Sequence, residues 1–228
     1  VEATLHAWSE LLVGRDPLQV AAICDDIQDR LPWKGGPVYG TAISAINQAL
    51  YDIAGRAWGV PVHTILGGAR RDRVRVYGHT SLDTPEAAVE GALAVRDAGF
   101  AGVKANPLET RVWTRDHQAV TQSTECVAAL RAALGDDFDI LLDAHGSPTA
   151  ELSLEFAEAI AEFRPLFLEE PVKVGSVEAL VEVSGKSPVP IATGEKLFHL
   201  RDFLPLIEAR ARAYPQPDVC HAFGISGL

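Results

Sequence analysis

Short apolar segments that each run into an acidic residue recur at a regular interval through the second half of the sequence. The four segments read DILLDAHG, PLFLEEP, PVPIATGEK and AYPQPDVCH. Their acidic residues are Asp143, Glu169, Glu195 and Asp218, which are 26, 26 and 23 residues apart. An interval of this length is typical of one strand, one helix and two loops.

Helix-patterned stretches separate the four segments, at residues 150–162, 176–184 and 200–210. A parallel strand needs a crossover of a dozen or more residues to return beside its neighbour, and a helix is the usual crossover. We therefore expect the four acids at the carboxyl ends of successive parallel strands. In a closed (β/α) barrel these ends meet at one mouth, where active sites lie.

The same alternation of strand and helix patterns begins at about residue 74. Residues 74–80 and 100–106 read as strands, and residues 85–98 and 115–134 read as the helices that follow them. Six strands are complete by Asp218, whereas a closed barrel needs eight. We therefore predict an α/β fold in which residues 73–228 form the first six βα units of a barrel, with about two further units beyond Leu228.

Residues 1–72 have a mainly helical pattern and are predicted to form a separate region. The dipeptide Asp16-Pro17 offers an N-cap and a first-turn proline for a helix that ends near Arg30. The strongest helix pattern lies at residues 41–58. Its apolar positions recur at steps of three and four residues and are Ile43, Ile46, Leu50, Ile53 and Ala57.

The chain contains no Met, begins at Val1, and stops after GISGL, where a helix is expected to follow. We therefore expect the natural protein to be longer at both ends.

Composition limits the partners of the protein. The formal net charge is −11, which argues against nucleic acid or an anionic membrane as a partner. The cysteines, Cys24, Cys126 and Cys220, form no CxxC pair, so a reduced cytoplasmic protein is expected. No apolar run approaches the roughly 18 residues of a membrane span, and no signal peptide is visible. The common nucleotide, zinc and serine-hydrolase motifs are absent from the sequence.

The acids Asp143, Glu169 and Glu195 are candidate metal ligands. Three carboxylates at one mouth, with no basic residue on the same strand tips, would repel one another unless a cation joined them. Oxygen-only ligands suit a hard divalent ion, and Mg²⁺ is the usual choice. The alternative is that each acid is the N-cap of the following helix. Glu170 adjoins Glu169, but strand alternation places only one of the two inside a barrel, and the 26-residue interval selects Glu169.

The motifs LLDAHG, FLEEP, ATGEK and QPDVCHAFGISG carry a family resemblance along the whole chain. They are similar to the enolase superfamily, specifically its mandelate racemase and muconate lactonizing enzyme family and, within it, the acid-sugar dehydratases of the galactonate type. The resemblance implies a modified TIM barrel behind a capping domain, of which residues 1–72 would be the helical part. It also implies Mg²⁺ bound by the three acids, a small-molecule sugar-acid substrate and a homo-oligomer.

The resemblance assigns further roles residue by residue. Asp218 matches the Asp of a His-Asp dyad whose His would come from a seventh strand outside this sequence; the alternative is a turn residue after Pro217. His145 matches the general acid that protonates the departing β-hydroxyl; the alternative is a surface His in a loop. His221 would contact substrate at the rim.

The pair Lys104 and Asn106 stands where racemases of the family carry Lys-x-Lys. Asn106 replaces a second base and favours one-sided elimination, with Asn106 itself as a substrate contact. Lys104 would contact the substrate carboxylate or serve as a salt-bridge partner inside the barrel.

Together these residues predict a Mg²⁺-dependent sugar-acid dehydratase. It would remove the proton next to the carboxylate of an aldonate such as galactonate and eliminate the β-hydroxyl to give a 2-keto-3-deoxy acid. Mg²⁺ would stabilise the enediolate that this deprotonation creates. The alternatives are a racemase or epimerase of a 2-hydroxy acid, a Schiff-base aldolase that uses Lys104, and a non-catalytic metal-binding relative.

Overall fold

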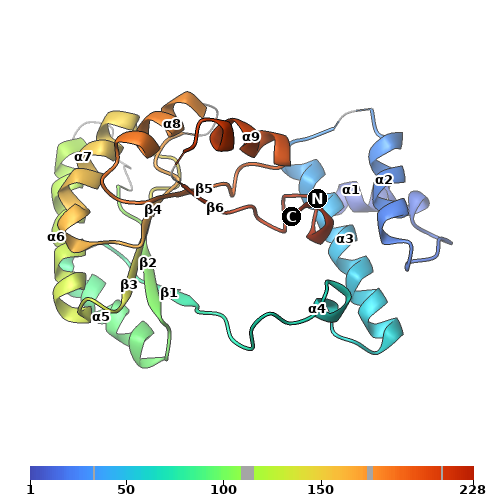
Figure 1. Ribbon diagram of the computed structural model, residues 1–228, viewed down its shortest axis with the longest axis horizontal. Helices are drawn as coiled ribbons and strands as arrows, with labels where there is room; N and C mark the ends of the chain where they lie inside the picture. The colour runs from blue at the N-terminus through green and yellow to red at the C-terminus, as the bar shows by residue number, and fades with distance from the viewer. Residues whose placement is uncertain (33, 109–115, 174–176, 212) are drawn as a thin grey trace. The chain divides into compact units, whose positions relative to one another are not determined.

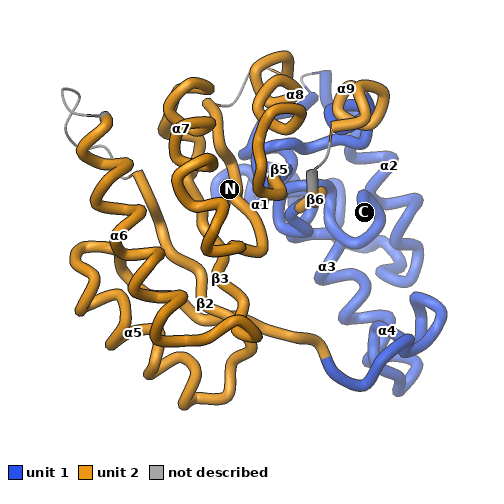
Figure 2. Tube along the Cα trace, turned by 60° about the vertical axis from the view of Figure 1, so that its left-hand side comes forward, with its two compact units in different colours: residues 1–73, 194–204, 217–228 blue, residues 74–193, 205–216 orange. Residues whose placement is uncertain are grey.

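The computed structural model divides the chain into two compact units (Figure 2). It describes residues 1–32, 34–108, 116–173, 177–211 and 213–228. The first unit comprises residues 1–73, 194–204 and 217–228, and the second comprises residues 74–193 and 205–216. The assignment of the two expected parts of the chain as a capping and a barrel domain stays a prediction. None of the described helices is long and apolar enough to cross a membrane.

A parallel six-stranded sheet forms the centre of the second unit. Its strands are β1 (Tyr77–His79), β2 (Gly102–Ala105), β3 (Asp139–Asp143), β4 (Phe167–Glu169), β5 (Ile191–Thr193) and β6 (Ala213–Pro215). They lie in chain order, and every neighbouring pair is parallel. The predicted α/β fold with successive parallel strands is therefore confirmed, while closure into a barrel by further strands stays a prediction.

Helices connect successive strands, as the patterning predicted. They are α5 (Pro85–Asp97), α6 (Asp116–Leu134), α7 (Ala150–Ile160, continued by the 3₁₀ turn Ala161–Phe163), α8 (Val177–Lys186) and α9 (Leu200–Glu208). Figure 1 shows α5 to α8 side by side along one face of the sheet. Thr84 caps α5 and Thr149 caps α7, each accepting a hydrogen bond from a first-turn backbone N–H. Asp143 is thus not the cap of the helix that follows it.

Strand alternation gives the sheet two chemically different faces. Val103, Ile140 and Leu168 are fully buried and share one face of the sheet by register. This face is covered by helices, because Gly78, the register partner of Val103, lies against Val95 of α5. Residues one position away point to the opposite face, where Leu141, Phe167 and Ala192 form a small apolar cluster. The register places three charged side chains on the same face as this cluster. Lys104 is paired with Leu141, Glu169 is paired with Ala192, and Asp143 is paired with Glu169. Alternation therefore directs the three charged side chains away from the helix-covered core.

Arg131, near the end of α6, fixes the loops that enter β3 and β4. Its guanidinium donates to the carbonyls of Gly135 and Phe138, which precede β3, and to those of Phe163 and Arg164, which precede β4. Burial lowers its pKa, but an arginine stays charged throughout the physiological range. One rigid side chain therefore satisfies four carbonyls and sets the positions of two adjacent strands.

The first unit is mainly helical. It contains α1 (Glu2–Ala7), α2 (Val20–Arg30), α3 (Pro37–Trp58), α4 (Val62–Ile65) and the 3₁₀ turns Ser9–Leu11 and Ile225–Gly227. The predicted start of the second helix at Asp16 was wrong, because the Asp16 carboxylate accepts a hydrogen bond from the Leu18 N–H in a turn and α2 begins at Val20. α3 begins earlier than predicted, at Pro37, since Gly36 provides the positive φ of the preceding residue.

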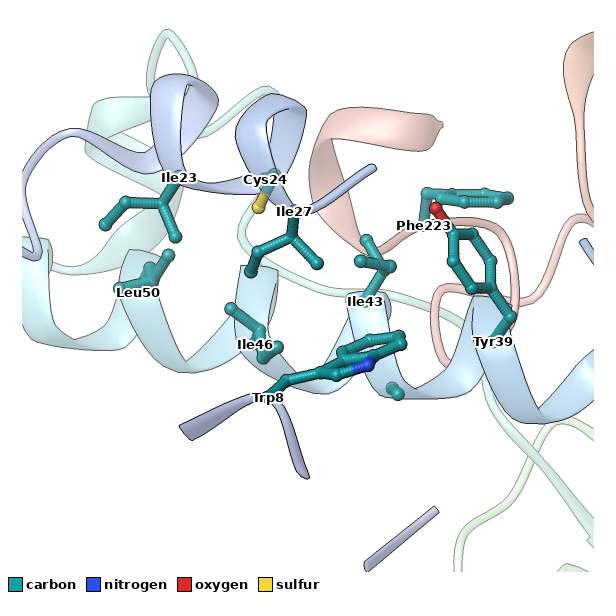
Figure 3. Close-up of a cluster of buried hydrophobic side chains, with 10 residues drawn as sticks. Trp8, Ile23, Cys24, Ile27, Tyr39, Ile43, Ile46, Leu50 and Phe223 are labelled. Carbon is teal, nitrogen blue, oxygen red and sulfur yellow. The ribbon is translucent and has the colours of Figure 1, made fainter. Parts of the chain in front are cut away.

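The core of the first unit lies between α2 and α3 (Figure 3). Its central side chains are Ile23, Ile27, Ile43, Ile46 and Leu50. Tyr39 packs edge-on against Trp8 and Phe223, with ring centroids 5.7 and 5.9 Å away. The predicted apolar stripe of α3 is confirmed as far as Leu50, but Ile53 is 41% exposed and Ala57 is also exposed. The shorter α2 covers only part of the 22-residue α3.

Ile27→Ala should destabilise the first unit by about 2–5 kcal/mol, because Ile27 is fully buried and the smaller side chain leaves a cavity. Ile53→Ala on the exposed side of α3 is the control and should change the free energy of unfolding by less than about 0.5 kcal/mol. Urea denaturation followed by circular dichroism measures both. Equal effects of the two substitutions would contradict the described core.

Arg131→Met should cost about 1–3 kcal/mol, because it leaves carbonyls before β3 and β4 without their donor. Arg131→Lys should recover only part of that loss, since an ammonium cannot match the forked geometry. The exposed Arg96, which pairs with its neighbour Asp97, supplies the control Arg96→Met, with little expected change. Thermal unfolding measures all three variants. An unaltered melting temperature for Arg131→Met would show that its hydrogen bonds to these carbonyls do not stabilise the fold.

Candidate functional site

Three charged side chains converge at the carboxyl ends of β2, β3 and β4. The Lys104 Nζ lies 2.8 Å from the Asp143 Oδ2 and 2.7 Å from the Glu169 Oε2. Asp143 and Glu169 are the last residues of their strands and face each other in the β3–β4 register. The prediction that these acids end successive parallel strands is confirmed. The neighbouring strand β2 supplies the basic residue of the cluster, Lys104.

The cluster is almost completely buried. Asp143, Glu169 and Lys104 are 1%, 3% and 8% exposed. Burial and the Asp143 charge raise the pKa of Glu169, although Lys104 opposes this. Burial alone would lower the pKa of Lys104, but its hydrogen bonds to both carboxylates outweigh burial and raise it. Lys104 is therefore an ammonium ion shared by two carboxylates, which is the salt-bridge role left open from the sequence.

His145 joins the cluster from the loop after β3. Its Nε2 lies 3.2 Å from the Asp143 Oδ2, and its backbone N–H donates to the Asp143 Oδ1 at 2.9 Å. The contact is made by the turn after β3, because β3 ends at Asp143 and His145 has φ 52°. Its side chain is 48% exposed, so the imidazole connects the buried carboxylate to the surface of this unit.

Gln216 and Thr193, which the sequence analysis did not identify, hydrogen-bond to the adjacent acids Glu169 and Glu170. The Gln216 side chain donates a hydrogen bond to Glu169, while the Gln216 backbone N–H pairs with the Thr193 carbonyl. The Glu170 carboxylate accepts a hydrogen bond from the Thr193 hydroxyl at 2.8 Å. Glu170 is also buried, and it is Glu169 that accepts the hydrogen bond from Lys104, in line with the choice made from the 26-residue interval. Gln216 directly follows β6, and its polar side chain at the end of a strand was the sequence signal that could have identified it.

The converging carboxylates suit a hard divalent cation. Two oxygens from adjacent strands already meet at one positively charged atom, and carboxylate oxygen is the donor that Mg²⁺ prefers. Within the described ranges, no group of three or more His, Cys, Asp or Glu side chains is gathered as a metal site would be. The third predicted ligand, Glu195, belongs to the first unit, where its carboxylate lies 3.0 Å from the Lys196 Nζ.

The remaining predicted residues occupy loops. Asp218 lies in a turn, as its alternative interpretation held, and its carboxylate accepts a hydrogen bond from the Cys220 N–H. The His221 Nε2 is 3.7 Å from the Asp218 Oδ2, and the His221 Nδ1 is 2.7 Å from the Thr41 hydroxyl. Asn106 follows β2 and is half-buried. The roles of these residues toward a substrate stay predictions.

Comparison with known proteins identifies both parts of the chain. Residues 87–228 match the family model described as enolase C-terminal domain-like. Residues 1–67 match the N-terminal domain model of the mandelate racemase / muconate lactonizing enzyme family.

Individual relatives agree with these matches. The chain is 36% identical to a D-galactonate dehydratase of Ralstonia nicotianae and 34% identical to one of Pectobacterium atrosepticum, over 99% of this chain and 59% of each relative. It thus spans about three fifths of the length of these curated relatives. The crystal structure of an enolase superfamily member from Salmonella Typhimurium matches with a TM-score of 0.90 and 27% identity, over 98% of this chain and 63% of the other. The chain therefore belongs to the mandelate racemase / muconate lactonizing enzyme family of the enolase superfamily.

Proposed function

We propose that this chain carries part of the active site of a Mg²⁺-dependent dehydratase that acts on a sugar acid such as galactonate. The observation that carries the proposal is the placement of His145 directly beside the buried Asp143–Glu169 pair, which sets a proton donor next to a candidate cation site. The relatives named D-galactonate dehydratase support the choice of substrate class.

Asp143 and Glu169 would hold the metal, with Glu195 as the third ligand. Mg²⁺ commonly binds through few protein carboxylates and keeps several waters, so the pair from β3 and β4 can anchor it. A bound Mg²⁺ supplies positive charge that stabilises the substrate oxygens as they become negative on loss of the α-proton. The hydrogen bond from Gln216 would keep Glu169 oriented for this role.

The elimination divides between two sides of the substrate. His145 would donate a proton from Nε2 to the departing β-hydroxyl, so that water leaves and the enol product tautomerises to a 2-keto-3-deoxy acid. Asp218 would orient a histidine base from a following strand, which takes the α-proton. Lys104 would add positive charge where the substrate carboxylate binds, and Asn106 and His221 would contact the substrate. Asn106 offers no second base on β2, which favours elimination over racemisation.

His145→Asn should lower 2-keto acid formation by at least about 10²-fold, because general acid catalysis commonly contributes 10²–10⁴-fold. The measurement screens the full-length protein and Mg²⁺ against a library of aldonates and follows 2-keto acid. Exchange of the α-proton with solvent deuterium should persist in this variant, since the base is a different residue.

The matched control for that variant is His117→Asn, which alters an exposed histidine paired with Glu155 on the helices and should leave the rate unchanged. If wild-type protein exchanges the α-proton of every aldonate but forms no keto acid, the reaction is racemisation or epimerisation. If His145→Asn loses exchange and elimination equally, His145 is not the acid.

Glu169→Gln should weaken Mg²⁺ binding by at least on the order of 100-fold, because it removes a charged ligand; loss of a mere supporting group already costs about 10–100-fold. Glu170→Gln, at the adjacent buried position outside the Lys104 cluster, should change the affinity by less than about threefold. Isothermal titration with Mg²⁺ alone measures both. A reversed order of the two variants would show that Glu170 is the ligand.

A further inference from the structure

The two carboxylates proposed to bind metal already share a cation that belongs to the chain. The Lys104 Nζ lies 2.8 Å from the Asp143 Oδ2 and 2.7 Å from the Glu169 Oε2, which are distances of strong charge-assisted hydrogen bonds. The other oxygen of Asp143 accepts the His145 backbone N–H at 2.9 Å. A metal ion that bound the Asp143 Oδ2 and the Glu169 Oε2 together would therefore compete with the Lys104 ammonium for the same two oxygens.

The side-chain ammonium is the donor that moves at smaller cost. The His145 N–H is fixed by the backbone turn after β3, whereas Lys104 has a flexible four-carbon stem. Besides its two ion pairs, the Nζ lies 5.8 Å from the centroid of the Tyr77 ring on β1, within the range of a cation–π contact.

We propose that Lys104 is a built-in counterion that holds the metal-free site together, and that a divalent cation binds by displacing the Lys104 ammonium from Asp143 and Glu169. The identity of the cation as Mg²⁺ rests on the proposed function. In its position between the two carboxylates, the ammonium offsets the repulsion and desolvation of two acids buried side by side.

The exchange has two opposite consequences for a variant without the ammonium. Metal-free Lys104→Met should be less stable than the wild type, because its paired carboxylates have lost their counterion. The same variant should bind Mg²⁺ about tenfold or more tightly, since the ion no longer competes with a positive charge at contact distance. Because a ligand stabilises the folded state according to its affinity, Mg²⁺ should raise the melting temperature of Lys104→Met more than that of the wild type.

The experiment compares wild type, Lys104→Met and Arg75→Met by thermal unfolding in EDTA and in Mg²⁺, and by titration with Mg²⁺. Arg75 is the matched control, because it pairs with Asp139 at the opposite end of β3, at 2.8 Å, and its removal changes the net charge equally. Arg75→Met should respond to Mg²⁺ as the wild type does. Equal Mg²⁺ affinities of Lys104→Met and wild type would overturn the exchange while the proposed function stands.

A second measurement uses the wild type and does not depend on the folding of a variant. Acylation of lysine amines, read by mass spectrometry, should modify Lys104 slowly in EDTA and several-fold faster in Mg²⁺, because the displaced ammonium leaves its buried ion pairs. Unchanged labelling of Lys104 in protein shown to bind Mg²⁺ would overturn the exchange alone. Wild-type protein that neither binds Mg²⁺ nor forms keto acid would overturn both the exchange and the proposed function.

Discussion

The ammonium of Lys104 between the carboxylates of Asp143 and Glu169 is the interaction on which the site depends. Parallel strands in register bring the last residues of β3 and β4 side by side, so two acids at these positions are forced together. Without a nearby cation, burial and mutual repulsion would favour protonation of one of the two acids. The positive charge that β2 contributes offsets the repulsion of the two acids where the three strand ends meet.

The two faces of the sheet divide the tasks of stability and chemistry. Side chains of one parity, such as Val103, Ile140 and Leu168, are fully buried on the face that helices cover and supply the hydrophobic stabilisation of the second unit. Side chains of the other parity carry the charged cluster, which contributes little net stability by itself. Arg131 links these tasks, because it fixes the loops that enter β3 and β4 at the ends opposite to the cluster.

Periodicity predicted the strand order and the pairing of Asp143 with Glu169, because strand and helix lengths determine where the next strand ends. It did not decide the partner of Lys104, since no repeat relates residues 65 positions apart. Periodicity also could not predict the contact of His145, because β3 ends at Asp143 and the contact is made by the following turn. Gln216 was missed because its hydrogen bond to Glu169 depends on the β5–β6 pairing rather than on a motif. Local turn chemistry likewise overrode the expected start of α2 at Asp16.

The loops after β3 and β4 each hold one residue near the strand end in a conformation that is uncommon for residues other than glycine. His145 has φ 52° and Glu170 has φ 45°, and backbone strain of this kind costs on the order of 1–3 kcal/mol for each residue. The Gly146 N–H donates to the Glu170 carbonyl at 2.7 Å, so the two strained turns stabilise each other. Glycine at position 145 would remove the strain but also the imidazole beside Asp143. The chain thus retains a strained residue at a position from which an imidazole reaches the buried carboxylate.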